Sequence, residues 1–164
     1  MRAMLAASEG KTHALILLLV TTGLRISEAL DARWNHLYAD PHGSTGLRVA
    51  GRGAKVRDVQ ILPAVVEALK PFRTGPAGYL IPNDKGARLS QQAADQAIAR
   101  AAQRAGIDKQ VSAHRLRHYL ANGADLLQVQ KDLGHAALAT IQRYLHAAKG
   151  LDKTSADFAA GGLL

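Results

Sequence analysis

Arg25 and Glu28 are oppositely charged residues at the end of a long apolar stretch, and they are the first candidates for a functional role. Arg25 follows a long apolar stretch, so its guanidinium is expected near the core, where a charge needs a partner. Glu28 lies three residues further along and could orient that guanidinium across one helical turn. The same spacing also fits an ordinary structural ion pair, because buried arginines are normally paired.

His114 and Arg117 form a second candidate pair. Their segment begins at Ser112, a suitable helix cap. With this spacing they share one helix face near the N-terminus, where the helix dipole favours anions. Arg offers two parallel donors to a phosphate, and His exchanges a proton near neutral pH. The alternative is a basic surface that faces only solvent.

His135 and Tyr144 complete the candidate set. His135 ends the sequence Leu-Gly-His, and Tyr144 lies in a predicted helix over 138–145. Taken alone, His135 fits a turn or cap residue, and Tyr144 fits the core or rim of a helix. Each candidate therefore has a structural alternative by itself, and only the order and combination of all of them indicate a function.

The elements that must position these residues are mostly helical. Residues 11–30 are apolar on most sides, which predicts a buried helix that ends or bends at Gly23. A second helix is predicted from Pro63 to about Phe72, because proline suits the first helical position. A third runs from the cap Ser90 to Ala105, with Gly106 as its stop. Further helices are predicted from Ala113 to 121 and over 126–133.

The β-structure is expected to be small. Leu47–Ala50 and Val56–Leu62 are short and β-rich, and a glycine-rich turn lies between them, which predicts a hairpin. Residues 40–46 are expected to be a loop, and residues 79–81 a short strand. Trp34 is expected to pack under the helix at 11–30. The predicted fold class is therefore mainly α with a small antiparallel β-hairpin or sheet (α+β).

Composition limits the function classes. The chain has 164 residues, no cysteine and a formal net charge of +8, which suits one domain with a polyanionic partner. Without cysteine, disulfides, thiolate metal sites and cysteine nucleophiles are excluded. The longest strictly apolar run, Ala14–Val20, is far shorter than the ~20 residues of a membrane span. We therefore expect a cytoplasmic protein with no membrane partner.

The ordered motifs resemble the tyrosine recombinase family of phage integrases and Xer-type recombinases. The resemblance rests on Thr-Gly-Leu-Arg-Ile-Ser-Glu at 22–28, Gly-Arg-Gly-Ala-Lys-Val-Arg at 51–57, His-Arg-Leu-Arg-His at 114–118, Leu-Gly-His at 133–135 and Ala-Thr-Ile-Gln-Arg-Tyr-Leu-His at 139–146. It implies the catalytic-domain fold of that family over residues 1–150. It also implies that residues 151–164 are a tail that could dock on a neighbouring protomer, and that the family's N-terminal core-binding domain is absent.

The resemblance implies a role for each candidate. Tyr144 would attack the scissile phosphate and form a 3′-phosphotyrosyl link, without a metal or any other cofactor. Arg25 and Arg117 would hold the non-bridging oxygens, and His135 would donate a hydrogen bond to one of them. His114 would assist removal of the tyrosine proton. Glu28 would support Arg25.

The family's hairpin lysine, which protonates the leaving 5′-oxygen, has no direct counterpart. Arg52 stands at the matching position and barely titrates, so we expect Lys55 to supply the proton and Arg52 to contact the DNA backbone. Arg57 and Arg115 are further candidate DNA-binding residues. The partners implied are double-stranded DNA and further copies of the chain, which would form a homo-tetramer on DNA in the nucleoid.

Two alternatives remain open on the sequence. The segment over 117–123 is shorter than in the family by about five residues, one and a half helical turns. This shortening and Arg52 would suit a DNA-binding remnant without catalysis. A type IB topoisomerase-like enzyme uses the same chemistry and is a further alternative.

Overall fold

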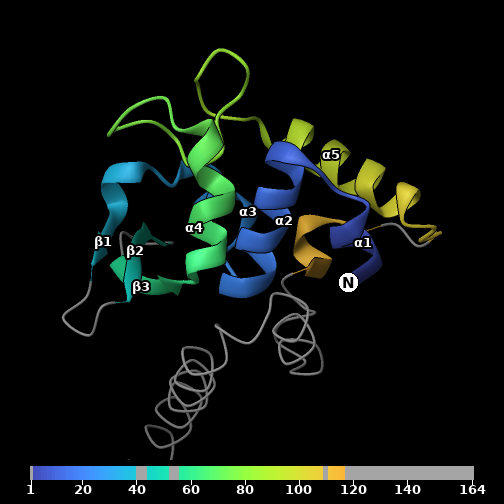
Figure 1. Cartoon of the computed structure of the whole chain (residues 1–164), viewed down its shortest axis with the longest axis horizontal. Coiled ribbons are helices and arrows are strands. Elements are labelled where there is room, and N and C mark those ends of the chain that lie inside the picture. The colour runs from blue at the N-terminus through green and yellow to red at the C-terminus, as the bar shows by residue number, and fades with distance from the viewer. Residues whose placement is uncertain (1, 40–43, 52–55, 109–110, 117–164) are drawn as a thin grey trace, which may run out of the picture. The chain divides into compact units, whose positions relative to one another are not determined.

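The structure is a computed structural model that describes residues 2–39, 44–51, 56–108 and 111–116 (Figure 1). All of these belong to one compact unit, Met1–Val129. Among the helices described, none is long and apolar enough to cross a membrane.

Helix α2 (Gly10–Thr22) is the centre of the core. Its residues from Ala14 to Thr21 are all buried, as the predicted apolar helix requires. The helix ends because Gly23 adopts a left-handed conformation (φ 64°), and its amide donates to the Leu19 carbonyl (3.0 Å). The chain then starts the separate helix α3 (Ile26–Asp31). The segment over 11–30 is therefore two helices, divided at the expected glycine.

Three antiparallel strands form one sheet in the order β1 (Leu37–Ala39), β2 (Thr45–Ala50) and β3 (Val56–Ile61). The predicted hairpin is confirmed as β2 and β3. Strand β1 was not predicted, and β2 begins at Thr45 inside the expected loop over 40–46.

Close packing explains the glycine at the second position of β2. Tyr38 pairs with Gly46, and a Cβ atom at Gly46 would lie 2.3 Å from the Tyr38 ring, so only glycine fits there without a shift.

The two faces of the sheet differ in character. On β2, the side chains of Leu47 and Val49 are buried, whereas Arg48 and Ala50 are exposed. Pairing continues this alternation onto β3, where Arg57 lies opposite Val49 and Asp58 opposite Arg48. Arg57 therefore belongs to the inner face, toward the core, and Arg48 and Asp58 to the outer face.

Helices α4 (Pro63–Leu69) and α5 (Gln91–Arg104) follow the predicted signals. Pro63 occupies the first turn of α4, and a 3₁₀ helix, η3 (Lys70–Phe72), follows it where Pro71 ends the α-helical pattern. The Ser90 hydroxyl accepts a hydrogen bond from the Ala93 amide (3.1 Å) and caps α5.

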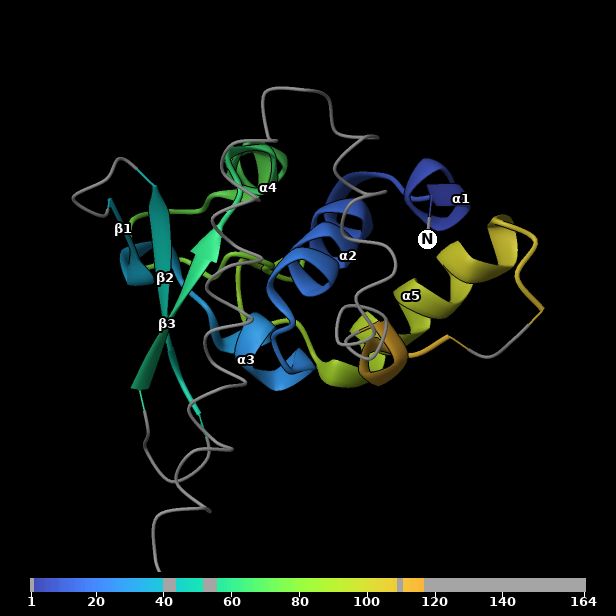
Figure 2. The ribbon, with the colours of Figure 1, turned by 90° about the horizontal axis from the view of Figure 1, so that it is seen from below.

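The described helices surround α2. It contacts the short N-terminal helix α1 (Arg2–Ala6), α3, α4, α5 and strand β3. Figure 2 shows α2 between the sheet on one side and α1 with α5 on the other. Helix α3 also packs on α5. The segment that precedes Arg25 is therefore held from several directions.

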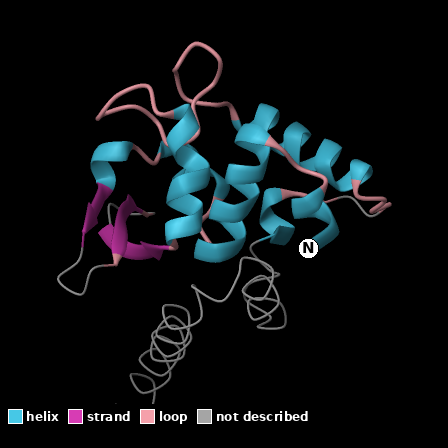
Figure 3. Cartoon of the chain, in the orientation of Figure 1, coloured by secondary structure: helices cyan, strands magenta, loops and turns pink. Residues whose placement is uncertain are grey.

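The segment between η3 and α5 is irregular (Figure 3), and the predicted strand over 79–81 is wrong. Tyr79 forms only an isolated bridge with Arg33, while Leu80 and Ile81 are fully buried. The Leu80 amide donates to the Ala32 carbonyl (2.9 Å). These apolar residues fill the core rather than join the sheet.

Trp34 begins a 3₁₀ helix, η1 (Trp34–His36), and is 8% exposed. Its amide donates to the Gly78 carbonyl (3.0 Å), and the Arg73 guanidinium lies over its ring, 5.1 Å from the centroid. Trp34 is therefore buried, and the interactions given for it join η1 to the irregular segment before α5. Its expected packing under the helix at 11–30 stays a prediction.

Candidate catalytic site

Arg25 occupies the N-cap position of α3, where its backbone is extended (φ −66°, ψ 150°). The preceding residue, Leu24, is fully buried and anchors the turn between α2 and α3. The Arg25 side chain is 50% exposed, although the residues before it are in the core. The turn thus brings a guanidinium from the core to the surface.

Glu28 is buried beneath Arg25 and accepts hydrogen bonds from two arginines. Its Oε2 accepts from the Arg25 amide (2.8 Å), and its Oε1 accepts from Arg25 Nη1 (3.3 Å). Arg57 donates from Nη1 to Oε1 (2.8 Å) and from Nη2 to Oε2 (2.7 Å). The Glu28 side chain is only 5% exposed, so its charge is compensated inside the protein.

These contacts set the charge state of Glu28. Burial raises the pKa of its carboxyl, but hydrogen bonds and charge from Arg57, together with hydrogen bonds from Arg25, more than offset that effect. The pKa of Glu28 therefore falls from 4.5 to about 2, and Glu28 is a carboxylate at any physiological pH. The hydrogen bond to Glu28 also raises the pKa of Arg57.

Sequence reasoning treated Arg57 only as a candidate DNA contact and missed its contact with Glu28. Both of its terminal nitrogens donate to that carboxylate, while its side chain is 40% exposed. The alternation along β3 was the available signal. Arg57 shares a strand face with Val59 and Ile61, and an arginine on such a face predicts a buried acidic partner.

His114 and Arg115 lie on the helical turn over 113–116. Ala113 and Leu116 are buried, whereas His114 and Arg115 are exposed. The Ser112 hydroxyl accepts a hydrogen bond from the Arg115 amide (3.4 Å), so the helix cap predicted at Ser112 is confirmed.

Helix α5 contacts both the helical turn over 113–116 and helix α3. The Ala113 amide donates to Asp95 Oδ1 on α5 (3.5 Å), and α3 packs on the same helix. Arg25, Glu28 and His114 therefore come from segments with a common support.

The structure brings Arg25 and Arg57 together on the carboxylate of Glu28. Several predicted residues and segments lie outside the described residues: Arg52, Lys55, Arg117, His135, Tyr144, the shortened segment over 117–123, the helices over 126–133 and 138–145, and the tail over 151–164.

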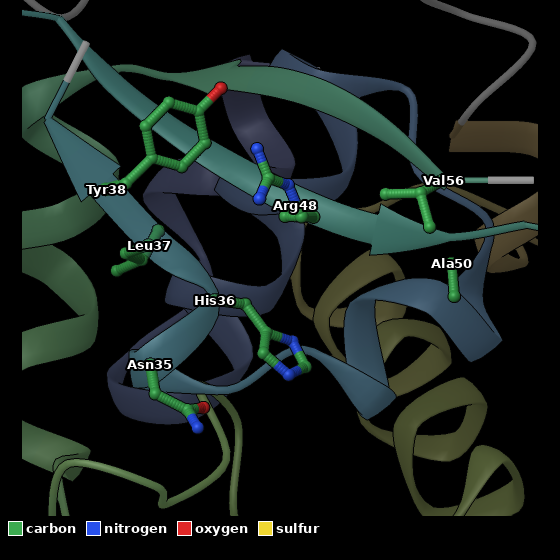
Figure 4. A pocket seen from close by; sticks show the side chains of 7 residues that line it. All are labelled: Asn35, His36, Leu37, Tyr38, Arg48, Ala50 and Val56. Carbon is green, nitrogen blue, oxygen red and sulfur yellow. The ribbon is translucent and has the colours of Figure 1, made fainter.

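A pocket of about 310 Å³ lies on the outer face of the sheet (Figure 4). It is lined by Asn35, His36, Leu37, Tyr38, Arg48, Ala50 and Val56. None of the predicted catalytic residues that the structure describes lines it. The same described part of the chain contains no group of three or more side chains suited to hold a metal ion.

A family model described as the phage integrase family matches residues 1–150. The chain belongs to the phage integrase family. This confirms the family that the ordered motifs resembled.

Curated relatives of this integrase-family chain are tyrosine recombinases. It is 40% identical over 145 residues to tyrosine recombinase XerC of Rhodospirillum centenum, a match that covers 82% of the chain and 42% of the relative. It is 38% identical over 152 residues to tyrosine recombinase XerD of Mycobacterium leprae, covering 82% of the chain and 47% of the relative. The integrase-family chain thus spans less than half the length of these relatives.

The fold has a solved counterpart. The crystal structure of XerH site-specific recombinase bound to difH substrate, a pre-cleavage complex, matches with a TM-score of 0.62 and 29% identity. The match covers 88% of this integrase-family chain and 48% of that one. The predicted fold class, helix-rich with a small antiparallel sheet, is confirmed.

Proposed function

We propose that the chain is the catalytic part of a site-specific DNA recombinase that breaks and rejoins strands through a covalent link to Tyr144. The observation that carries this proposal is the arrangement of Arg25. It is held at its backbone and side chain by buried Glu28, yet its guanidinium is half exposed. Family membership and the similarity to recombinases support the same function.

In the proposed reaction, the Tyr144 oxygen attacks the scissile phosphorus as its proton passes to His114. A bond forms between that oxygen and phosphorus, and the bond from phosphorus to the 5′-oxygen breaks. Lys55 gives its proton to the leaving 5′-oxygen. The phosphodiester energy is kept in the 3′-phosphotyrosyl link, so rejoining to another 5′-hydroxyl needs no nucleotide.

Arg25, Arg117 and His135 would stabilise the charge that builds on the non-bridging oxygens. A preorganised donor of this type typically contributes roughly 10²–10³ in rate. Arg25 suits this role because its backbone and side chain are already fixed before DNA binds, so little reorganisation is needed at the moment of reaction.

Double-stranded DNA is the proposed partner, consistent with the net charge of +8. Arg52 and Arg115 are proposed to contact its backbone. We further propose that the active assembly is a homo-tetramer on DNA.

A nicked DNA duplex tests the function directly. When the nick lies close to the scissile phosphate, the short fragment diffuses away after cleavage and the covalent protein–DNA adduct accumulates. We expect the wild-type chain to form an adduct that survives denaturing electrophoresis, and Tyr144→Phe to form none. Tyr38→Phe, on the outer face of the sheet, is the matched control and should react normally.

Two other outcomes would identify the alternatives. If wild-type protein binds the duplex but forms no adduct where a full-length relative does, the chain is a non-catalytic DNA-binding remnant. If it instead relaxes supercoiled plasmid without site preference, it is a type IB topoisomerase-like enzyme.

A further inference from the structure

Glu28 is the point at which the hairpin meets the turn that carries Arg25. Arg57 reaches it from β3, two residues after Lys55, and Arg25 reaches it from the N-cap of α3. Each carboxylate oxygen accepts from both arginines: Oε1 at 2.8 and 3.3 Å, and Oε2 at 2.7 and 2.8 Å. A single buried carboxylate therefore fixes two parts of the chain relative to each other.

The charge of this cluster favours a phosphate at Arg25. An Arg25–Glu28 pair alone would be neutral, and the carboxylate would compete with a phosphate for the Arg25 guanidinium. Arg57 supplies a second positive charge and two short hydrogen bonds, so the three groups together carry a net +1. With Arg57 bound to Glu28, the longer bond from Arg25 Nη1 (3.3 Å) is the weaker one.

Arg57 makes these contacts on the inner face of the sheet. It lies opposite Val49, whose side chain is buried, whereas its neighbour Asp58 pairs with Arg48 on the outer face. Arg48 makes an equivalent two-bond contact to Asp58 (3.0 and 3.2 Å), but that contact is exposed and does not involve Arg25. Arg48 and Arg57 thus make similar two-bond contacts to carboxylates, but only the contact from Arg57 leaves the sheet and reaches α3, where Glu28 also accepts from Arg25.

We propose that Arg57 is a positioning residue for the recombination reaction: through Glu28 it holds the Arg25 guanidinium available to the scissile phosphate and ties it to the hairpin strand. The proposal rests on the proposed function. It replaces the role expected from the sequence, a direct contact between Arg57 and DNA.

Single-turnover cleavage of the nicked duplex at saturating protein separates these roles. We expect Arg57→Gln to lower the cleavage rate constant by roughly 10–10²-fold, the scale of a displacement of about 1 Å, while the DNA dissociation constant stays within about two-fold. Arg57→Lys, which keeps the charge, should recover part of the rate. Arg48→Gln, the matched control on the outer face, should cleave at the wild-type rate.

The salt dependence of DNA binding tests the opposing role, in which Arg57 contacts DNA directly. A residue that neutralises one phosphate contributes roughly 0.9 to the slope of log affinity against log salt concentration. If Arg57→Gln lowers that slope by this amount while the cleavage rate at saturation is unchanged, Arg57 is a DNA contact and the proposal is wrong.

A double-mutant cycle tests the route through Glu28. If Arg57 acts through Glu28, the combined variant Glu28→Gln/Arg57→Gln should cleave no slower than Glu28→Gln alone. If the combined variant instead loses cleavage rate by the product of the two single-variant losses, Arg57 acts independently of Glu28 and the proposal is overturned.

A measurement without catalysis separates this proposal from the proposed function. The Nε–H resonance of Arg25 in ¹⁵N-labelled protein reports the surroundings of its guanidinium. It should shift in Arg57→Gln and stay unchanged in Arg48→Gln, even if wild-type protein forms no adduct and the recombinase function fails. An Arg25 resonance that is the same in wild type and Arg57→Gln would overturn the positioning role.

Discussion

The Arg25 amide and the Arg25 guanidinium both donate to the carboxylate of Glu28, one at each oxygen. The amide contact is half of a capping box, in which a glutamate in the first turn closes the start of its helix. The guanidinium contact uses the same carboxylate to orient a charged side chain. Helix initiation and orientation of Arg25 therefore depend on one residue.

We expect Glu28→Gln to destabilise the protein by about 3 kcal/mol at neutral pH, the equivalent of a pKa lowered from 4.5 to about 2. Because the pKa is lower in the folded state, this stabilisation is complete above about pH 5 and is lost as the pH falls from 4.5 toward 2. Urea unfolding of wild type and variant across this range measures it, and the difference should narrow on acidification. Asp108→Asn, at an exposed carboxylate that follows α5, is the control. If the difference in unfolding free energy between wild type and Glu28→Gln did not change with pH, the lowered pKa of Glu28 would be contradicted.

We expect Gly23→Ala to slow cleavage as well as destabilise the fold. A left-handed backbone (φ 64°) costs an L-residue about 1 kcal/mol, and this turn leads directly to Arg25. Gly86→Ala imposes the same strain (φ 76°) in a turn after η3 and is the control. The two variants should lose similar unfolding free energy, but only Gly23→Ala should lower the single-turnover rate. Equal cleavage rates would show that the turn does not position Arg25.

We expect Lys55→Ala to slow cleavage by roughly 10²–10⁴-fold, the usual contribution of a general acid. A substrate with sulfur in place of the bridging 5′-oxygen should restore the rate, because a thiolate leaves without being protonated. Arg52→Ala should weaken DNA binding without this rescue. If instead Arg52→Ala is rescued by sulfur and Lys55→Ala cleaves normally, the two roles are reversed.

We expect Arg115→Ala to weaken DNA binding and to reduce the salt slope by roughly 0.9, since Arg115 is exposed on the turn over 113–116. Fluorescence anisotropy with a labelled duplex at several salt concentrations measures both quantities. Arg100→Ala, exposed on α5, is the control. A slope equal to that of wild type would exclude a phosphate contact.

We expect deletion of residues 151–164 to reduce assembly on DNA, if Phe158, Leu163 and Leu164 dock on a neighbouring protomer. Sedimentation of the protein–DNA complex measures the number of protomers bound. The same tetramer with and without the tail would contradict the docking role.

Local signals predicted much of the fold. The Ser90 cap and the Gly106 stop set the bounds of α5, and Gly23 marked the end of α2, because these residues satisfy or terminate helical hydrogen bonds within a few positions. Strand β1 carried no such signal. It has only three residues, and it forms a strand because β2 lies beside it.

In the candidate site, too, contacts between residues close in sequence could be predicted, and contacts between distant residues could not. The Arg25–Glu28 contact could be predicted, because the two residues are one helical turn apart. The contact between Arg57 and Glu28 joins a strand to a helix far apart in sequence, and charge and spacing could not show which partner Arg57 would choose. Likewise, the apolar residues over 79–81 had the composition of a strand, but their burial beside Ala32 decided their structure.

Trp34 is the only tryptophan in the sequence, and it is almost fully buried beneath the Arg73 guanidinium. Its indole emission is therefore expected at short wavelength in the folded protein and at longer wavelength once water reaches the ring. The protein thus contains its own optical probe at a single known position. Unfolding of every variant that retains Trp34 can be followed by that emission, with no dye attached.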